Sequence, residues 1–145
     1  GIHCTSDAPY VLLRLGARRA EEGAYIWQKL MQSGAIVGNG TDAPVEDVSP
    51  LASFYASVSR KLKDGSVFYP AQRMSREEAL HAYSAAGAWM SNEEDKKGTL
   101  SVGKWADLVV LRGYLNFAIT PGTPRMPPPC GPPRRGSACA GFAQW

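Results

Sequence analysis

The sequence predicts an α/β fold, in which helices alternate with strands, and the order of three segments leads to this prediction. Apolar residues recur at helical spacing over 17–32, a mostly apolar run follows at 35–39, and helix-start signals come next at Ser49 and Pro50. A short, unbroken apolar run is typical of a strand buried on both faces. The order helix, strand, helix is typical of the end of a fold that alternates the two elements.

The first two helices are expected on either side of this strand. The first spans residues 17–32, with Gly34 as a C-cap glycine, because several apolar residues share one helical face. These are Ala20, Ala24, Trp27, Leu30 and Met31. The second spans about residues 50–61, since Ser49 is a favourable N-cap and a proline such as Pro50 suits the first helical position.

A third helix is expected after a loop at residues 62–74. The S-x-x-E sequence from Ser75 to Glu78 matches a capping box, in which the two side chains bond each other's backbone amides. An apolar stripe follows it and consists of Ala79, Leu80, Tyr83, Ala86 and Met90.

Strands are also expected near both ends of this region. Residues 1–9 have the pattern of a strand end that runs into a loop. Residues 99–100 and 106–111 flank Gly103 and Lys104, which predicts two strands joined by a tight turn.

Residues 112–145 differ in composition from the rest. Most of the prolines lie between Pro121 and Pro133, and no lysine or acidic residue follows Asp107. Such a segment buries too little apolar surface to become ordered by itself. We expect either a disordered tail or the product of a shifted reading frame, and the weaker alternative is a proline-rich ligand for another protein. We therefore expect residues 112–145 to be separate from the rest of the chain.

Composition narrows the classes of function. Four of the 16 basic residues lie after Asp107, whereas all 13 acidic residues lie at or before it, so the region before the tail has no basic excess for nucleic acid. The sequence contains no run of about 18 apolar residues, so no membrane-spanning helix is predicted. Three irregularly spaced cysteines argue against a disulfide framework, which favours a reducing, cytoplasmic setting.

Asp42 is the main candidate for chemistry. It lies in Gly40-Thr41-Asp42-Ala43-Pro44, directly after the predicted buried strand. In barrels of alternating β and α elements, active sites form at the carboxyl ends of the strands. A carboxylate there could bind a metal ion and accept a proton from water. The simpler alternative is a turn aspartate that bonds nearby backbone amides.

His3, with Ser6 and Asp7 close by, forms a second candidate cluster. A histidine at a strand end could contact substrate or relay a proton. Alternatively, Ser6 or Asp7 caps a helix. Glu46 and Asp47 could orient substrate, but we expect them to be solvated loop acids. We expect His81 to be a surface or packing residue of the third helix.

Four motifs in this order resemble amidohydrolase family 3. They are His3-Cys4-Thr5-Ser6-Asp7, the segment from Asn39 to Glu46, Ser75 to Leu80, and the segment from Gly98 to Val110. The Gly98–Val110 pattern is common to amidohydrolases in general, whereas the first two point to a subgroup that includes N-substituted formamide deformylases. The resemblance covers about residues 1–111.

The resemblance implies three domains: the C-terminal part of a (β/α)8 TIM barrel over residues 1–92, part of a small β-sandwich over residues 93–111, and the tail at 112–145. Asp42 would end the eighth barrel strand, bind a divalent metal, expected to be zinc, and shuttle a proton from the attacking water to the leaving amine. His3 would end the seventh strand and face the substrate. A complete barrel needs about 250 residues, so most of the barrel would lie outside this chain.

The resulting hypothesis is a fragment of a metal-dependent hydrolase of non-peptide C–N bonds, acting on a small-molecule amide or formamide. The other family metal ligands would precede Gly1, so we expect the chain alone to be inactive. The alternative is a non-enzymatic truncated product, or an interaction module that uses the proline-rich tail. No feature of the sequence specifies an oligomeric state.

Overall fold

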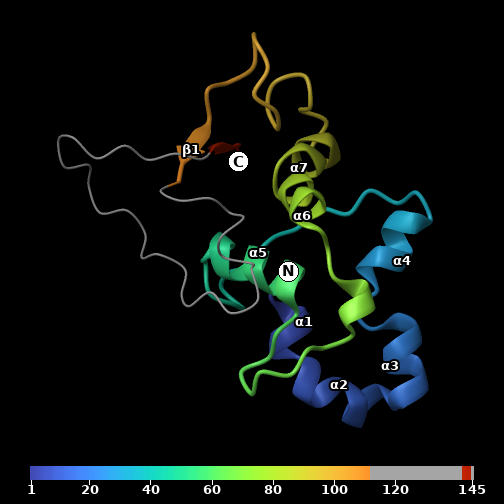
Figure 1. Ribbon diagram of the computed structural model, residues 1–145. Helices are drawn as coiled ribbons and strands as arrows, with labels where there is room; N and C mark the ends of the chain where they lie inside the picture. Colours follow the sequence, from blue (N-terminus) through green and yellow to red (C-terminus); the bar gives the residue numbers. More distant parts are fainter. Residues whose placement is uncertain (112–141, 145) are drawn as a thin grey trace, which may run out of the picture. The chain divides into compact units, whose positions relative to one another are not determined.

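The computed structural model describes residues 1–111 and 142–144, which form two compact units (Figure 1). The first unit spans Gly1–Ala82 and the second begins at Tyr83. Helices predominate in the first unit, whereas the described strands belong to the second. The predictions for residues 112–141 and 145 fall outside the described residues.

Four short helices open the first unit: α1 (His3–Ser6), α2 (Ala8–Leu15), α3 (Ala17–Gly23) and α4 (Trp27–Gln32). The strand end predicted for residues 1–9 is therefore wrong, because α1 and the start of α2 occupy this stretch. The single helix predicted for 17–32 is divided into α3 and α4. Ala24 is extended and Tyr25 has a φ of 55°, which a continuing right-handed helix does not allow.

Residues 35–39 do not form the buried strand that the apolar pattern predicts. Most of the run is exposed, including Ile36 at 42%. The Asn39 backbone amide donates a 3.0 Å hydrogen bond to the carbonyl of Ala82, at the end of α6 (Arg76–Tyr83). A strand needs a neighbouring strand for its backbone groups, and none of the described segments of the first unit pairs with this run.

The helix α5 (Pro50–Ser59) confirms the predicted N-terminus at Ser49 and Pro50. The Ser49 side chain accepts a hydrogen bond from the Ala52 amide at 3.3 Å, which satisfies a donor that the first helical turn leaves free. The buried face of α5 consists of Ser53, Phe54, Ala56, Ser57 and Val58. The helix ends at Ser59, close to the predicted end near residue 61, because Arg60 adopts a left-handed conformation.

The loop after α5 packs against the core of the first unit. Lys61 and Val67 form an isolated antiparallel bridge, and the 3-10 helix η1 (Pro70–Gln72) follows. Phe68 is buried in a cluster with residues from α2, α3 and the α3–α4 junction, namely Ala8, Val11, Ala20 and Ala24. The loop thereby joins these helices to α5.

The capping box at the start of α6 is confirmed. The Glu78 amide donates to Ser75 Oγ at 3.1 Å, and the Ser75 amide donates to Glu78 Oε2 at 2.7 Å. The predicted helix does not continue unbroken to Met90, because Ser84 has non-helical backbone angles and α7 (Ala85–Met90) begins after it. Ala79, Ala82 and Ala86 are buried, whereas Met90 is 50% exposed.

In the second unit, β1 (Leu108–Val110) pairs antiparallel with β2 (Phe142–Gln144), with Val109 opposite Ala143. The predicted pairing of 106–111 with 99–100 is therefore wrong. The Lys104 ammonium instead donates to the carbonyl of Glu94 and to Thr99 Oγ1, which holds this loop together. The strand β2 also gives three residues of the predicted disordered tail a regular structure.

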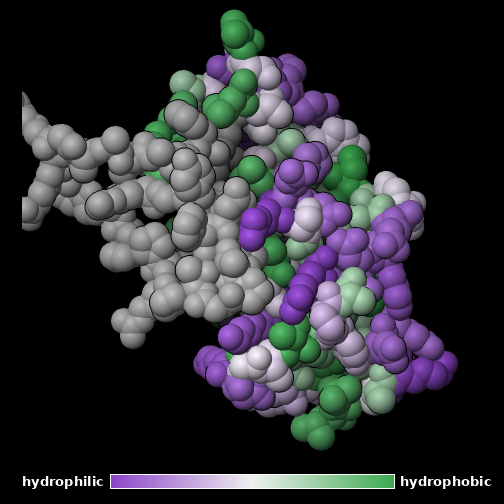
Figure 2. Space-filling view, in the orientation of Figure 1, coloured by the Kyte–Doolittle hydropathy of each residue, from purple (hydrophilic) through white to green (hydrophobic). Residues whose placement is uncertain are grey.

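The surface combines charged and apolar side chains (Figure 2). Over α2, the side chains of Tyr10, Leu12 and Leu13 are more than half exposed. Among the described helices, none has the length and apolar character that a membrane span requires.

Candidate active site around Asp42 and His3

Asp42 occupies a turn with unusual backbone geometry. Its φ is 58°, a left-handed conformation that aspartate tolerates better than most residues do. Its carbonyl accepts hydrogen bonds from the amides of Val45 at 2.8 Å and Glu46 at 3.3 Å. These bonds fold the segment back on itself, so that Glu46 returns toward the start of the turn.

His3 lies directly beside Asp42. The distance between His3 Nε2 and Asp42 Oδ2 is 2.9 Å, although the two residues are 39 positions apart in the sequence. The Asp42 side chain remains 63% exposed, and the His3 side chain is 28% exposed. The carboxylate is thus oriented through one oxygen while it stays open to solvent.

Glu46 contacts the other ring nitrogen of His3. Glu46 Oε1 lies 3.2 Å from His3 Nδ1 and accepts a hydrogen bond from Ser6 Oγ at 2.5 Å. Its side chain is only 20% exposed. The prediction that Glu46 is a solvated loop acid is therefore wrong. Its spacing of four residues from Asp42, across a turn that contains Pro44, is the signal that could have indicated this contact.

The capping role considered for Ser6 and Asp7 is not found. Neither side chain caps a described helix, although Asp7 stands at the N-cap position of α2. Asp7 instead accepts a hydrogen bond from the Tyr25 hydroxyl, and its Oδ2 lies 3.8 Å from His3 Nδ1. Burial and the neighbouring carboxylate of Asp7 raise the pKa of Tyr25.

Contacts with α5 fix the position of α1 and of the Asp42 turn. The buried thiol of Cys4 lies 3.6 Å from the carbonyl of Ala56, and burial raises the pKa of this thiol to about 11. On the other side, Asn39 Nδ2 donates to Ser57 Oγ at 2.7 Å, and Ser53 Oγ donates to the Gly40 carbonyl at 3.1 Å. One helix thereby anchors both halves of the site.

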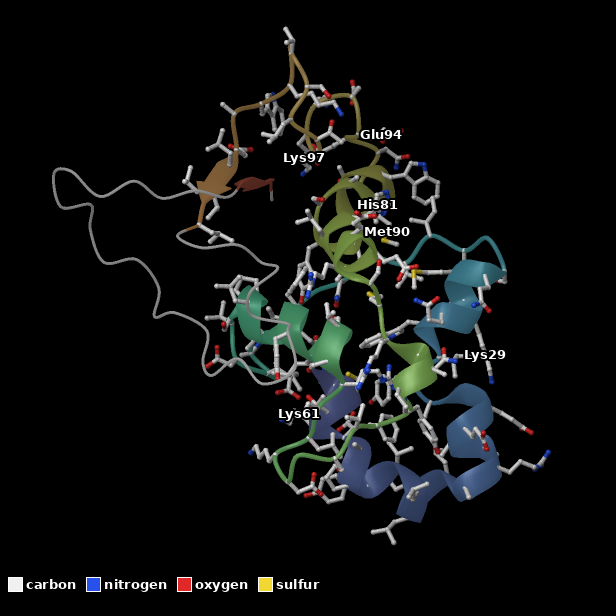
Figure 3. All side chains as sticks on the ribbon, viewed as in Figure 1. Lys29, Lys61, His81, Met90, Glu94 and Lys97 are labelled. Carbon is white, nitrogen blue, oxygen red and sulfur yellow. The ribbon has the colours of Figure 1, made fainter. Side chains whose placement is uncertain are left out.

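Asp47 and His81 do not belong to the cluster formed by His3, Asp42 and Glu46. Asp47 Oδ1 accepts a 2.7 Å hydrogen bond from the Ser49 amide just before α5, which is a local structural role. His81 is exposed on α6, away from the helix α1 that carries His3 (Figure 3). This agrees with the prediction that His81 is a surface residue.

The described residues do not make a complete metal site. A catalytic zinc ion normally takes three protein ligands and a water molecule. Within residues 1–111 and 142–144, no group of three His, Cys, Asp or Glu side chains has an arrangement that could hold a metal ion. Asp42, with its exposed carboxylate, fits the chemistry of one ligand in such a set.

The fold of this chain is similar to part of a solved hydrolase structure. A metal-dependent hydrolase from Pyrococcus furiosus, known from its crystal structure, is similar over 72% of this chain with a TM-score of 0.59 and 35% identity, and the match covers 20% of that chain. At this level of identity, the likeness extends to both fold and sequence.

A sequence profile of the amidohydrolase family matches residues 1–125. The chain therefore belongs to the amidohydrolase family, as its motifs indicated, and the match extends beyond the residues 1–111 that those motifs cover.

Two curated proteins illustrate this relationship. Protein LONG AFTER FAR-RED 3 of Arabidopsis thaliana is 36% identical over 110 residues, which are 75% of this chain and 19% of that protein. The N-substituted formamide deformylase of Arthrobacter pascens is 27% identical over 84 residues, or 58% of this chain and 16% of that protein. The chain thus spans about a fifth or less of the length of these relatives.

Proposed function

We propose that this chain is part of a longer metal-dependent hydrolase that cleaves a non-peptide C–N bond in a small-molecule amide or formamide. The observation that carries the proposal is the Asp42 carboxylate, which His3 Nε2 contacts at 2.9 Å while 63% of the side chain stays exposed. Family membership supports the hydrolase class. The name of the formamide deformylase relative supports the choice of bond.

In this proposal, Asp42 acts on the proton of the attacking water. The carboxylate accepts that proton as the water oxygen attacks the carbonyl carbon, and it then donates the proton to the nitrogen of the leaving amine. His3 holds Asp42 in the required orientation and lies close enough to contact a substrate bound there. General acid–base catalysis of this kind contributes roughly 10²–10⁴-fold to the rate.

We further propose that Asp42 supplies one ligand to a divalent metal, expected to be zinc, whose other ligands come from parts of the protein outside this chain. A bound zinc ion polarises the carbonyl and lowers the pKa of water. The proposed frame for these ligands is the end of a (β/α)8 barrel, where strands deliver side chains to a common face.

The test is the Asp42→Asn variant of the full-length protein that contains this chain. Asparagine is nearly isosteric and tolerates a left-handed backbone, so folding should be retained. Hydrolysis of N-acyl and N-formyl amines should fall by roughly 10²-fold or more, because the amide cannot accept the proton. The exposed Glu77→Gln variant is the control. Wild-type kcat/KM in the Asp42→Asn variant would contradict the assignment.

A further inference from the structure

The contacts of His3 are asymmetric, and the asymmetry points to Glu46. Nε2 faces Asp42 at 2.9 Å and Nδ1 faces Glu46 at 3.2 Å. Asp7 also approaches Nδ1, but its Oδ2 lies 3.8 Å away and accepts a hydrogen bond from Tyr25. An N–H···O hydrogen bond has a donor–acceptor distance of about 2.7–3.2 Å. Glu46 is therefore the carboxylate nearest to Nδ1, and the two groups form an ion pair when the imidazole is protonated.

Glu46 is itself held in place. Ser6 Oγ donates to Glu46 Oε1, and the Glu46 amide donates to the Asp42 carbonyl at 3.3 Å. Its side chain is the least exposed of the three carboxylates around His3, at 20% against 51% for Asp7 and 63% for Asp42. The attraction between opposite charges is stronger where water is partly excluded, so this ion pair restrains the imidazole ring.

We propose that Glu46 is a positioning residue, which acts on Asp42 through His3. Its contact with Nδ1 fixes the plane of the imidazole ring, and the opposite nitrogen then orients one oxygen of Asp42. Without Glu46, the ring rotates about its side-chain bonds and the Asp42 carboxylate loses its fixed orientation. The inference rests on the proposed function, since the outcome for the reaction depends on Asp42 acting on water.

The first experiment measures turnover of N-formyl and N-acyl amines by the full-length protein that contains this chain. In Glu46→Gln, kcat should fall by roughly 10-fold to 10²-fold with little change in KM, because a misplaced catalytic group affects the reacting geometry more than substrate binding. Glu46→Asp keeps the charge and should recover part of that loss. Asp7→Asn, which changes the more distant carboxylate, should reduce kcat by less than Glu46→Gln does.

The second experiment does not depend on activity. Nitrogen-15 labelling of histidine in the full-length protein that contains this chain gives imidazole signals, and His3→Gln and His81→Gln assign the two sets that belong to this chain. The Nδ1–H signal of His3 should be observed and protected from exchange with water. Glu46→Gln should move this signal and speed its exchange, whereas the signals of His81 should stay unchanged as an internal reference.

The outcomes separate the two proposals. An active wild-type protein, with an unchanged kcat and an unchanged His3 signal in Glu46→Gln, would overturn the role of Glu46 and leave the proposed function standing. An altered His3 signal with an unchanged kcat would show that the contact exists but does not position Asp42, which also overturns the inference. An inactive wild-type protein with an altered His3 signal would instead contradict the proposed function.

Discussion

Arg60 holds the region after α5 together through a fully buried guanidinium group. Its Nε donates to the Phe68 carbonyl at 2.6 Å, and Nη1 donates to the carbonyls of Tyr25 and Gln72 at 3.0 and 3.4 Å. The guanidinium carbon lies 4.8 Å from the centre of the Trp27 ring and 5.2 Å from that of Phe68. One side chain thus satisfies carbonyls from three segments, while burial lowers its pKa.

We expect Arg60→Lys to destabilise the chain by about 2–4 kcal/mol, because lysine cannot reproduce the planar donors and leaves buried carbonyls unsatisfied. Denaturant unfolding followed by circular dichroism measures the change. Arg73→Lys is the matched control. Arg73 is exposed, and its Nε donates one hydrogen bond, to the Ser59 carbonyl. A loss below about 0.5 kcal/mol in Arg60→Lys would contradict this account.

At the scale of single elements, the helix starts follow local rules. The reciprocal bonds between Ser75 and Glu78 and the cap provided by Ser49 each involve residues three positions apart. Residues this close in sequence meet whenever the helix forms, so the sequence predicts these contacts reliably. The breaks at Tyr25 and Ser84 were not predicted, because they depend on how the flanking residues pack in the folded chain.

The capping box gives a prediction for α6. Ser75→Ala should lower the free energy of unfolding by about 1 kcal/mol, because the Glu78 amide loses its acceptor. Glu78→Gln should cost less, since glutamine retains an acceptor oxygen for the Ser75 amide and also suits a capping box. Thermal or denaturant unfolding of both variants tests this order. An equal or larger loss in Glu78→Gln would contradict it.

At the scale of the whole molecule, the sequence profile establishes membership of the amidohydrolase family. The TIM barrel, the zinc ion and a cytoplasmic location stay predictions. The domain boundaries and the roles of Asp42 and His3 likewise stay predictions. The exposed apolar side chains over α2 include Leu13 at 84%.

We therefore expect the 145-residue chain alone to show no hydrolase activity and no tight binding of a catalytic metal. A catalytic zinc normally takes three protein ligands, and no three His, Cys, Asp or Glu side chains of the described residues are arranged to hold a metal ion. The chain would be expressed alone and dialysed with zinc, and its metal content and turnover of N-acyl and N-formyl amines would be measured. Stoichiometric zinc together with zinc-dependent turnover would contradict both this prediction and a site completed from outside the chain.

The sequence alone predicted the family and identified Asp42 as the leading catalytic candidate. Both predictions depend only on the order of residues: the order of the motifs, and a carboxylate within a Gly-Thr-Asp-Ala-Pro segment. It also predicted the starts of α5 and α6, which depend on neighbouring residues. Apolar runs were less reliable: the run at 35–39 lacks a strand partner, and β1 pairs with β2 instead of a nearby segment.

Only the tertiary structure decided that His3 contacts both Asp42 and Glu46. The His3–Asp42 contact joins residues 39 positions apart, and α5 brings them together by binding α1 at Cys4 and the Asp42 turn at Ser53 and Ser57. Local propensities do not encode such contacts, because the chain must first lose the entropy of closing a long loop. Packing against a shared helix compensates for that loss, and it exists only in the folded chain.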